Sequence, residues 1–453
     1  MKKDIVIIGG NPAGGTAAMV AKKLNKEKSV LVIRKEPESL VPCGIPYIFG
    51  TLTSVEEDIK PLTGAKKAGV EFLIDEVISI DTAEKTLFLK NSENISYEKL
   101  ILALGSEPIV PPIPGADLEG VVTVRKELDY IRKINELLKQ AKNVVVVGAG
   151  FIGVEMSDEI VKNGTNVTLI EAMDNILPLA FDADFSEIAR KSLKNHGVKL
   201  RVGEKVKQIN GKNGVVSDIK LESGETIPAD MVLFAIGYRS NTELARNAGL
   251  NIGVYNGIIT DDYLRTSVSD VFAVGDCAEH RDYFTHKVSR VMLASTSASE
   301  ARIAGMNLYD LNVIRQTKGC IAVFSTSLGE ISLGAAGLTE QAAKAEGFKV
   351  VIGNYSGFDH HPQKMPGTAT QTIKLVFAEK GGLLLGAQIS GGLSTGEMIN
   401  ILGLAIQKAM TMEELSIFQY GTQPLLTAGP GLYPIAQAAI DAIAKCGVNS
   451  LSL

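Results

Sequence analysis

The sequence predicts an α/β protein with two Rossmann-like dinucleotide-binding domains and a separate C-terminal α+β domain. Two segments support this prediction, because each combines an apolar strand, a glycine-rich turn, a helix and a second apolar strand. The first segment begins at Ile5 and the second at Asn143. After about residue 320 the pattern changes to strands over 350–355, 370–377 and 383–389, followed by a helix over 396–410.

The first segment predicts a bound dinucleotide. A buried strand over 5–8 leads into Gly9-Gly10-Asn11-Pro12-Ala13-Gly14, and a helix over 15–25 and a strand over 30–33 follow. Glycines permit the tight turn, and the helix N-terminus offers free N–H groups and a positive dipole end to a pyrophosphate. Asn11 stands where the middle glycine of G-x-G-x-x-G usually lies. The residues expected at this site are Gly9, Asn11, Pro12, Ala13 and Gly14.

The second segment carries the complete glycine motif. A strand over 143–147 precedes Gly148-Ala149-Gly150-Phe151-Ile152-Gly153, and Glu171 follows the next strand, 18 residues after Gly153. A carboxylate at this place accepts hydrogen bonds from a ribose diol and repels a 2′-phosphate, so we expect NADH in preference to NADPH. The alternative interpretation of Glu171 is a solvated carboxylate at a strand end. The residues expected here are Gly148, Gly150, Phe151, Ile152, Gly153 and Glu171.

Two dinucleotide sites in one chain suggest one permanently bound flavin and one exchanging nicotinamide. Three further strands end in small residues, which permit close approach of the backbone to a ligand. They are the strand ending at Ala103-Leu104-Gly105, the strand over 231–236 before Gly237, and the strand over 271–274 before Gly275-Asp276. We expect Asp276 to bond a ribitol hydroxyl.

Prolines and glycines predict where the chain crosses between domains. Four prolines within 107–115 make a stiff crossing out of the first domain, and 237–241 marks the crossing back. The first domain is therefore expected to be discontinuous. The predicted ranges are 1–113 with 242–325 for the first domain, 114–241 for the second, and 326–453 for the C-terminal domain.

Composition narrows the choice of partners and compartment. The 453 residues have a net charge of −5, which argues against nucleic acid as the main partner. No apolar run reaches the length of a membrane span, and the N-terminus enters a strand at once without a signal-peptide layout. The four cysteines are scattered and do not form a disulfide framework. We therefore expect a reducing, cytoplasmic setting with no membrane partner.

Cys43 is the most informative single residue. Positions 38 and 48 are not cysteine, and the next cysteine is Cys277, so Cys43 has no local partner for a disulfide. Redox chemistry at Cys43 would need an external sulfur or a sulfenic acid. Pro42 suits the first position of a helix, which would place Cys43 in a first turn whose dipole lowers the thiol pKa. The alternative is a small buried hydrophobe, the interpretation we adopt for Cys277, Cys320 and Cys446.

Other polar residues give weaker signals. His360 and His361 are adjacent, but no further histidine or cysteine has metal-ligand spacing, so no metal site is expected. Lys22 and Lys23 belong to a lysine-rich helix face that is ordinarily solvated.

The chain resembles the flavin-dependent pyridine nucleotide–disulfide oxidoreductases over essentially its whole length. The matching segments are the first glycine turn, Ser39-x-x-x-Cys43, the strand end at Ala103-Leu104-Gly105, 148–155 and Val274-Gly275-Asp276. Within this family it is similar to the single-cysteine branch. That branch includes coenzyme A-disulfide reductases, NAD(P)H persulfide or polysulfide reductases, NADH oxidases and NADH peroxidases. The resemblance implies an FAD domain, an NAD domain and a C-terminal dimerisation domain, with Ser39 and Glu155 among the cofactor-binding residues.

Several positions depart from the family pattern. Peroxidases and water-forming oxidases usually have a histidine in the first turn, where this chain has Pro12. Tyr420 resembles a tyrosine that coenzyme A-disulfide reductases contribute from the partner subunit. Lys364-Met365 occupies the place of a second such tyrosine. Arg34 stands where the family often has the glutamate that binds the flavin ribose, and Lys35-Glu36 follows, with Glu36 as a substitute for that acid.

The resemblance implies a homodimeric flavoprotein that uses NADH and FAD to reduce coenzyme A persulfide, polysulfide or coenzyme A disulfide. Cys43 is expected to be the nucleophile and Tyr420 of the partner chain the acid. Residues expected to bind coenzyme A are Lys22, Lys23, Ser39 and Lys364. Two alternatives stay open: an NADH oxidase that makes hydrogen peroxide, and a flavin-bearing redox sensor with no real turnover.

Overall fold

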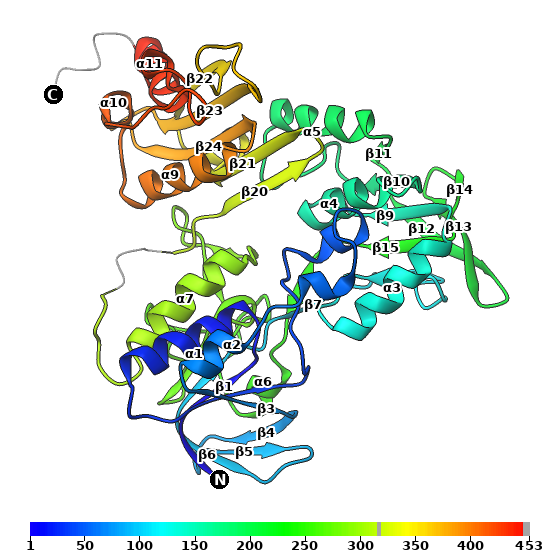
Figure 1. Ribbon diagram of the computed structural model, residues 1–453, viewed down its shortest axis with the longest axis vertical. Coiled ribbons are helices and arrows are strands. Elements are labelled where there is room, and N and C mark those ends of the chain that lie inside the picture. Colours follow the sequence, from blue (N-terminus) through cyan, green and yellow to red (C-terminus); the bar gives the residue numbers. More distant parts are fainter. Residues whose placement is uncertain (315–318, 447–453) are drawn as a thin grey trace.

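A computed structural model describes residues 1–314 and 319–446 (Figure 1). Parts of the two predicted ranges 242–325 and 326–453 therefore lie outside the described residues. The strands fall into three main sheets, and the molecule in Figure 1 shows one group of elements around each sheet. This is an α/β protein with two Rossmann-like parts and a C-terminal α+β part, as the glycine motifs predict. The predicted domain boundaries themselves stay a prediction.

The first sheet has the order β3-β2-β1-β6-β5-β4, and β17 pairs with β6. Its central strands are parallel and nearly fully buried, because apolar β-branched residues such as Ile5 and Val30 face helices or loops on both sides. The helices α1 and α7 pack against each other on this sheet, although they are far apart in sequence. The elements are β1 (Lys2–Ile8), α1 (Pro12–Leu24), β2 (Val30–Arg34), α2 (Thr63–Lys67), β3 (Val70–Ile74), β4 (Val77–Asp81), β5 (Thr86–Leu89), β6 (Ile95–Leu102), α6 (Glu243–Asn247), β17 (Val271–Ala273), β18 (His280–Arg281), β19 (Val288–Ser289) and α7 (Ala294–Met306).

The second sheet is parallel, with the order β11-β10-β9-β15-β8. The antiparallel sheet β12-β13-β14 adds a small β layer, and the pair β7–β16 forms where the chain crosses between the two parts. The elements are β7 (Ser106–Pro108), β8 (Val121–Thr123), α3 (Leu128–Gln140), β9 (Asn143–Val147), α4 (Phe151–Val161), β10 (Asn166–Glu171), α5 (Ala183–Asn195), β11 (Lys199–Val202), β12 (Val206–Lys212), β13 (Val215–Leu221), β14 (Thr226–Pro228), β15 (Met231–Phe234) and β16 (Tyr238–Ser240).

The C-terminal part is an antiparallel sheet of order β20-β21-β24-β23-β22. Helix α9 packs on β20, β21 and β24, whereas α11 packs on β22 and β23 (Figure 1). The predicted helix over 396–410 is shorter, and the sequence had not indicated β20 and β21. The elements are β20 (Val323–Leu328), β21 (Ile331–Gly337), α8 (Glu340–Ala345), β22 (Val350–Phe358), β23 (Thr370–Ala378), β24 (Leu384–Gly391), α9 (Thr395–Gln407), α10 (Met412–Ile417) and α11 (Pro434–Cys446).

Four short 3₁₀ helices complete the described chain: η1 (Ile45–Phe49), η2 (Val55–Asp58), η3 (Gly275–Cys277) and η4 (Pro430–Leu432). The first two belong to the segment that carries Cys43. None of the helices in 1–314 and 319–446 combines the length and apolarity needed to cross a bilayer.

Candidate active site

The first glycine turn brings five predicted site residues together at the carboxyl ends of β1, β6 and β17. A side chain on Gly9 would place its Cβ 2.2 Å from the Ala103 carbonyl oxygen, and one on Gly14 would lie 1.9 Å from the Gly9 carbonyl oxygen. Gly9 and Gly275 also have φ angles of 107° and 74°, a region in which other residues are strained. A Cβ on Gly275 would lie 3.0 Å from the Ala13 Cβ. These contacts are the close backbone approaches that a dinucleotide-binding turn requires.

The N-terminus of α1 is open toward this turn. Asn11 is the N-cap residue, but its side chain makes no capping hydrogen bond, and Pro12 occupies the first helical position. A proline there has no N–H to donate, but its fixed φ suits the helix start. The remaining first-turn N–H groups are thus available for an anionic ligand.

Asp276 lies beside the first turn within a polar cluster. Its Oδ2 accepts a hydrogen bond of 2.7 Å from the Ser106 hydroxyl and lies 3.5 Å from the Lys126 Nζ. Ser297 approaches Oδ1 at 3.4 Å. Sequence analysis predicted Asp276 but missed its three partners, because Ser106, Lys126 and Ser297 lie in unrelated segments and carry no motif.

The buried pair of Glu300 and His280 is hydrogen-bonded to the Gly275-Asp276 turn. The Gly275 N–H donates to Glu300 Oε2 at 2.9 Å, and His280 Nε2 lies 3.1 Å from the same oxygen. Burial alone would lower the pKa of His280, but the adjacent Glu300 carboxylate raises it. This pair therefore fixes the position of the turn.

The end of β2 departs from the sequence expectation in an informative way. Arg34 is buried, and its Nε donates to the backbone carbonyl of Glu36, whereas Nη1 and Nη2 have no hydrogen-bond partner. Lys35 is exposed and pairs with Glu76 at 2.5 Å. Burial raises the pKa of Glu36, and the carboxylates of Glu127 and Asp129 at the start of α3 raise it further. A role for Lys35 and Glu36 at the cofactor stays a prediction.

The second glycine turn has the same construction. A Cβ on Gly153 would lie 1.8 Å from the Gly148 carbonyl oxygen, and one on Gly148 would lie 2.6 Å from the Ala235 carbonyl oxygen. By contrast, a Cβ on Gly150 would meet no atom within 4 Å, so the space in front of it is open. Phe151 and Ile152 begin α4 directly behind the turn.

Glu171 lies against this second turn. Its Oε2 accepts the Ala149 N–H at 2.7 Å and its Oε1 accepts the Met173 N–H at 2.8 Å. The two backbone bonds hold the carboxylate at the end of β10, beside the glycines. The predicted position of Glu171 relative to the turn is therefore observed, and its role toward a ribose stays a prediction.

Cys43 does not lie in the first turn of a helix. The helix in this segment is η1, which begins at Ile45 after Gly44, and Cys43 is an exposed residue of the preceding turn. The expectation that Pro42 starts a helix is thus wrong. The expected fall in the thiol pKa is also wrong: desolvation by surrounding atoms and the carboxylate of Glu155 raise the pKa of Cys43, and Lys126 offsets this only in part.

Two carboxyls from different elements surround the Cys43 turn. Glu155 comes from α4, accepts a 2.7 Å hydrogen bond from Thr326, and has its pKa raised to about 7, chiefly by burial. Asp58 comes from η2, and burial raises its pKa to about 6. Its Oδ1 is 1.8 Å from where a Cβ on Gly44 would lie, so Gly44 is required beside it. The Asp276 carboxylate also raises the pKa of the Cys43 thiol. Sequence analysis missed Asp58, which has no motif around it.

The Cys43 segment lies on the second Rossmann-like part. Thr51 donates to Glu159 Oε2 at 2.8 Å, and Asn163 donates to the Phe49 carbonyl at 2.6 Å. In Figure 1 the blue trace of this segment lies beside α4. Cys43 therefore lies near groups of both glycine turns, because Glu155 of α4 and Asp276 both act on its thiol.

Tyr420 lies in the C-terminal part. Its hydroxyl donates to the Pro430 carbonyl at 2.6 Å, and its ring stacks on Tyr433 with centroids 4.0 Å apart. Lys364 is exposed on the same part of the chain. The Lys22 ammonium donates hydrogen bonds to two backbone carbonyls beyond the end of α1, so two of its three N–H donors are already used within the chain. Coenzyme A contacts by these residues stay a prediction.

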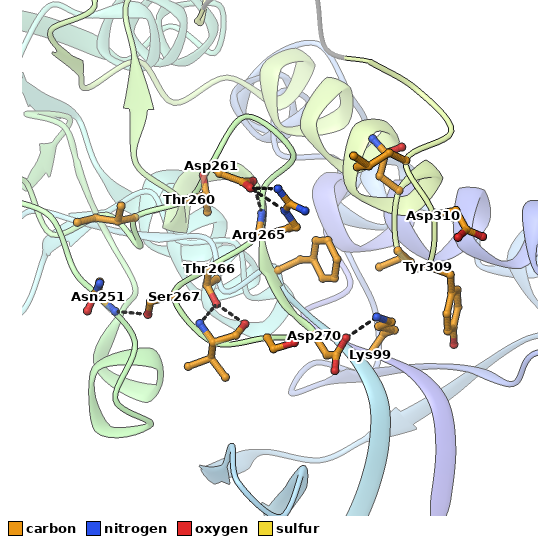
Figure 2. A pocket seen from close by; sticks show the side chains of 17 residues that line it. Lys99, Asn251, Thr260, Asp261, Arg265, Thr266, Ser267, Asp270, Tyr309 and Asp310 are labelled. Atoms are coloured by element: carbon orange, nitrogen blue, oxygen red, sulfur yellow. Dashed lines mark hydrogen bonds and ion pairs between the residues drawn. The ribbon is translucent and has the colours of Figure 1, made fainter.

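A cavity of about 580 Å³ lies elsewhere in the first Rossmann-like part (Figure 2). It is lined by residues of 251–272 and 307–311 with Lys99, and it includes none of the predicted site residues. Four of its charged residues form two ion pairs, Lys99 with Asp270 and Arg265 with Asp261 (Figure 2). We therefore do not assign it to the redox site.

Comparisons with known proteins identify the family of the chain. Residues 3–301 match the family described as pyridine nucleotide-disulphide oxidoreductase, and residues 323–430 match its dimerisation domain. A protein named NADH oxidase from Methanocaldococcus jannaschii is 32% identical over 97% of this chain and 98% of its own length. A protein named NAD(P)H coenzyme A polysulfide/persulfide reductase from Pyrococcus horikoshii is 34% identical over 86% of this chain and 88% of its own length.

The fold has a close counterpart among solved structures. Reduced CoADR-RHD from Bacillus anthracis superposes with a TM-score of 0.91 at 26% identity, covering 98% of this chain and 81% of that protein. The glycine turns, the Cys43 segment and the C-terminal sheet fall within the matched ranges. This chain belongs to the pyridine nucleotide-disulphide oxidoreductase family.

Proposed function

We propose that the protein is an NADH-dependent flavoprotein reductase that reduces coenzyme A persulfide, polysulfide or coenzyme A disulfide through Cys43. The observation that carries the proposal is the exposed Cys43 thiol, which lies close enough to Glu155 of α4 and to Asp276 for both carboxylates to act on it. The relative named coenzyme A polysulfide/persulfide reductase supports the substrate class. We propose a reducing cytoplasmic setting, with a small sulfur compound rather than nucleic acid or membrane as partner.

The residues of the first site fit FAD. The cradle of Gly9, Gly14 and Gly275 leaves no room for side chains, and Asp276 presents a carboxylate beside it. When bound, FAD would supply a two-electron carrier between nicotinamide and sulfur. The second site fits NADH, because Gly148 and Gly153 form the turn and the Glu171 carboxylate disfavours a 2′-phosphate.

The reaction at Cys43 is a thiol–disulfide exchange. The Cys43 thiolate attacks one sulfur of the substrate, a bond forms between the two sulfurs, and the substrate S–S bond breaks. The departing thiolate takes a proton, which we assign to Tyr420 of the partner subunit. Two electrons that originate from NADH then cleave the new S–S bond, which restores the Cys43 thiolate and releases the sulfur held on it, after protonation, as a second thiol or as hydrogen sulfide. Glu155, whose pKa is raised to about 7, can hold a proton beside this turn near neutral pH, whereas Asp58, with a pKa of about 6, is mostly ionised there.

A homodimer follows from the same proposal. The C-terminal part carries large apolar side chains that are mostly exposed in the single chain, including Leu393 at 90%, Ile417 at 81% and Leu426 at 67%. Side chains of this size and exposure are available for burial against a second copy. Together with the match to a dimerisation domain, they support a second copy as the partner.

An NADH oxidase that forms hydrogen peroxide is the second candidate, and the Methanocaldococcus jannaschii relative named NADH oxidase supports the oxidase activity but does not name the product. Pro12 begins α1 at the place where peroxidases and water-forming oxidases usually have a histidine, and it cannot move a proton. This observation disfavours further reduction of peroxide at the site. A redox sensor is the third candidate, and steady-state turnover with sulfur substrates distinguishes it from an enzyme.

Cys43→Ser tests the proposal, with Cys446→Ser as the matched control because Cys446 is a partly exposed thiol outside the site. Cys43→Ser should retain FAD and its reduction by NADH, and it should lose reduction of polysulfide and coenzyme A disulfide. The control should retain all of these. Near wild-type turnover by Cys43→Ser would contradict the thiol mechanism. Mass spectrometry of wild type purified without reductant should show a coenzyme A adduct on Cys43.

A further inference from the structure

Arg34 combines two properties that rarely occur together in a folded protein. Arg34 is only 5% exposed, and neither Nη1 nor Nη2 has a hydrogen-bond partner. Its single bond runs from Nε to the backbone carbonyl of Glu36. The carboxylates of Glu36 and Glu38 act on it only at longer range, and burial lowers its pKa.

A guanidinium remains charged even when it is buried, because its pKa lies far above neutrality. A buried charge without a partner strongly destabilises a protein, so buried guanidinium groups are normally paired with carboxylate or phosphate. The two free Nη atoms of Arg34 therefore indicate a binding site for an acceptor that residues 1–314 and 319–446 do not supply.

The place of Arg34 in the fold identifies the class of that acceptor. The side chain folds back over the first glycine turn, since its Cδ lies 3.1 Å from where a Cβ on Gly10 would be. This turn opens helix α1, whose N-cap side chain makes no hydrogen bond to the first-turn N–H groups. A cation and an open helix N-terminus at one place form a site for a phosphate group.

We infer that Arg34 binds the pyrophosphate of FAD and holds its ADP half by charge, where the family often has a glutamate for the ribose. The inference rests on the FAD part of the proposed function and is independent of the sulfur substrate. A charge-assisted contact of this kind contributes about 10- to 100-fold to affinity.

The first experiment compares thermal stability with and without FAD in wild type, Arg34→Met and Arg246→Met. Arg246 is exposed, lies in α6 and bonds only Asn256 through its guanidinium, so its variant makes the same change of charge on the surface. Arg34→Met should raise the Tm of the FAD-free protein by a few degrees, because it removes an unpaired buried charge. It should lower the Tm of the FAD-loaded protein relative to wild type.

Opposite changes in Tm, a rise without FAD and a fall with FAD, distinguish a role of Arg34 in FAD binding from a role in packing. If Arg34 only packed the core, Arg34→Met would lower Tm in both states, and that result would overturn the inference. Arg246→Met should change neither Tm appreciably. If Arg34→Met fails to fold, Arg34→Lys replaces it, because Lys retains the charge without the planar fork and should lose only part of the FAD affinity.

The second experiment measures FAD affinity by titrating the FAD-free protein and following flavin fluorescence. Arg34→Met should weaken FAD binding about 10- to 100-fold, and Arg246→Met should leave it unchanged. In competition against FAD, wild type should prefer ADP strongly over adenosine, and Arg34→Met should lose most of that preference. Equal FAD affinity, or an unchanged preference for ADP, would overturn the inference. A wild-type protein that binds no FAD would instead contradict the proposed function.

Discussion

Replacing Asp58 by Asn is expected to stabilise the folded protein at pH 7 and to change it little near pH 4. Asp58 is 5% exposed, its Oδ2 has no hydrogen-bond partner, and burial raises its pKa from 3.8 to about 6. A carboxyl whose pKa is higher in the folded state binds more protons there than in the unfolded chain. Its contribution is therefore favourable only while it is protonated, and stability is lost as pH rises from about 4 through about 6.

The size of the effect follows from the two pKa values. One pKa unit corresponds to about 1.36 kcal/mol, so ionisation of Asp58 in the folded protein costs about 3 kcal/mol at pH 7. Asn has a similar shape and no charge at any pH, so the variant avoids this cost. About 1 kcal/mol moves Tm by about 2–4 °C in a domain of 150–250 residues, which predicts a rise of several degrees at pH 7.

Thermal unfolding of wild type and Asp58→Asn at pH 4, 5.5 and 7 measures the effect. Glu57→Gln is the matched control, because Glu57 lies in the same 3₁₀ helix but is exposed, and hydrogen bonds from Thr53 lower its pKa. The control should not stabilise the protein at pH 7. A Tm difference between wild type and Asp58→Asn that is the same at all three pH values would refute the raised pKa.

Three further predictions concern the chemistry of the site. Glu155→Gln should shift the alkylation of Cys43 by iodoacetamide to lower pH, because the Glu155 carboxylate raises the thiol pKa; an unchanged rate–pH profile would exclude this coupling. Glu171→Arg should reduce or reverse the preference for NADH over NADPH in kcat/KM by about 1–3 kcal/mol. If the variant keeps the wild-type ratio of kcat/KM for the two nucleotides, another residue determines the preference. Tyr420→Phe should slow coenzyme A disulfide reduction by about 10²–10⁴ and polysulfide reduction less, since the coenzyme A thiolate needs protonation more. Mixed dimers of inactive Cys43→Ser and Tyr420→Phe subunits should regain activity at one of two sites, and continued inactivity after confirmed subunit exchange would contradict the assignment in trans.

The sequence by itself determined the two dinucleotide turns. Each turn is one strand–turn–helix unit in which close backbone contacts require glycine, at Gly9 and Gly14 in the first and at Gly148 and Gly153 in the second. Their spacing can therefore be recognised from the sequence without the rest of the fold. The absence of a second cysteine near Cys43 is likewise a property of the chain alone. Both features are local, and each was located correctly from residue order.

Only the tertiary structure decided the electrostatic state of the site. Local reasoning placed Cys43 at a helix start and expected a lowered thiol pKa, but desolvation, followed by the carboxyls of α4 and η2, raises the thiol pKa. The unpaired burial of Arg34 also depends on the packing of β2 against the first turn, which no motif indicates. A pKa or an unpaired charge depends on groups that approach through space from distant segments, and a sequence pattern records only those that are neighbours along the chain.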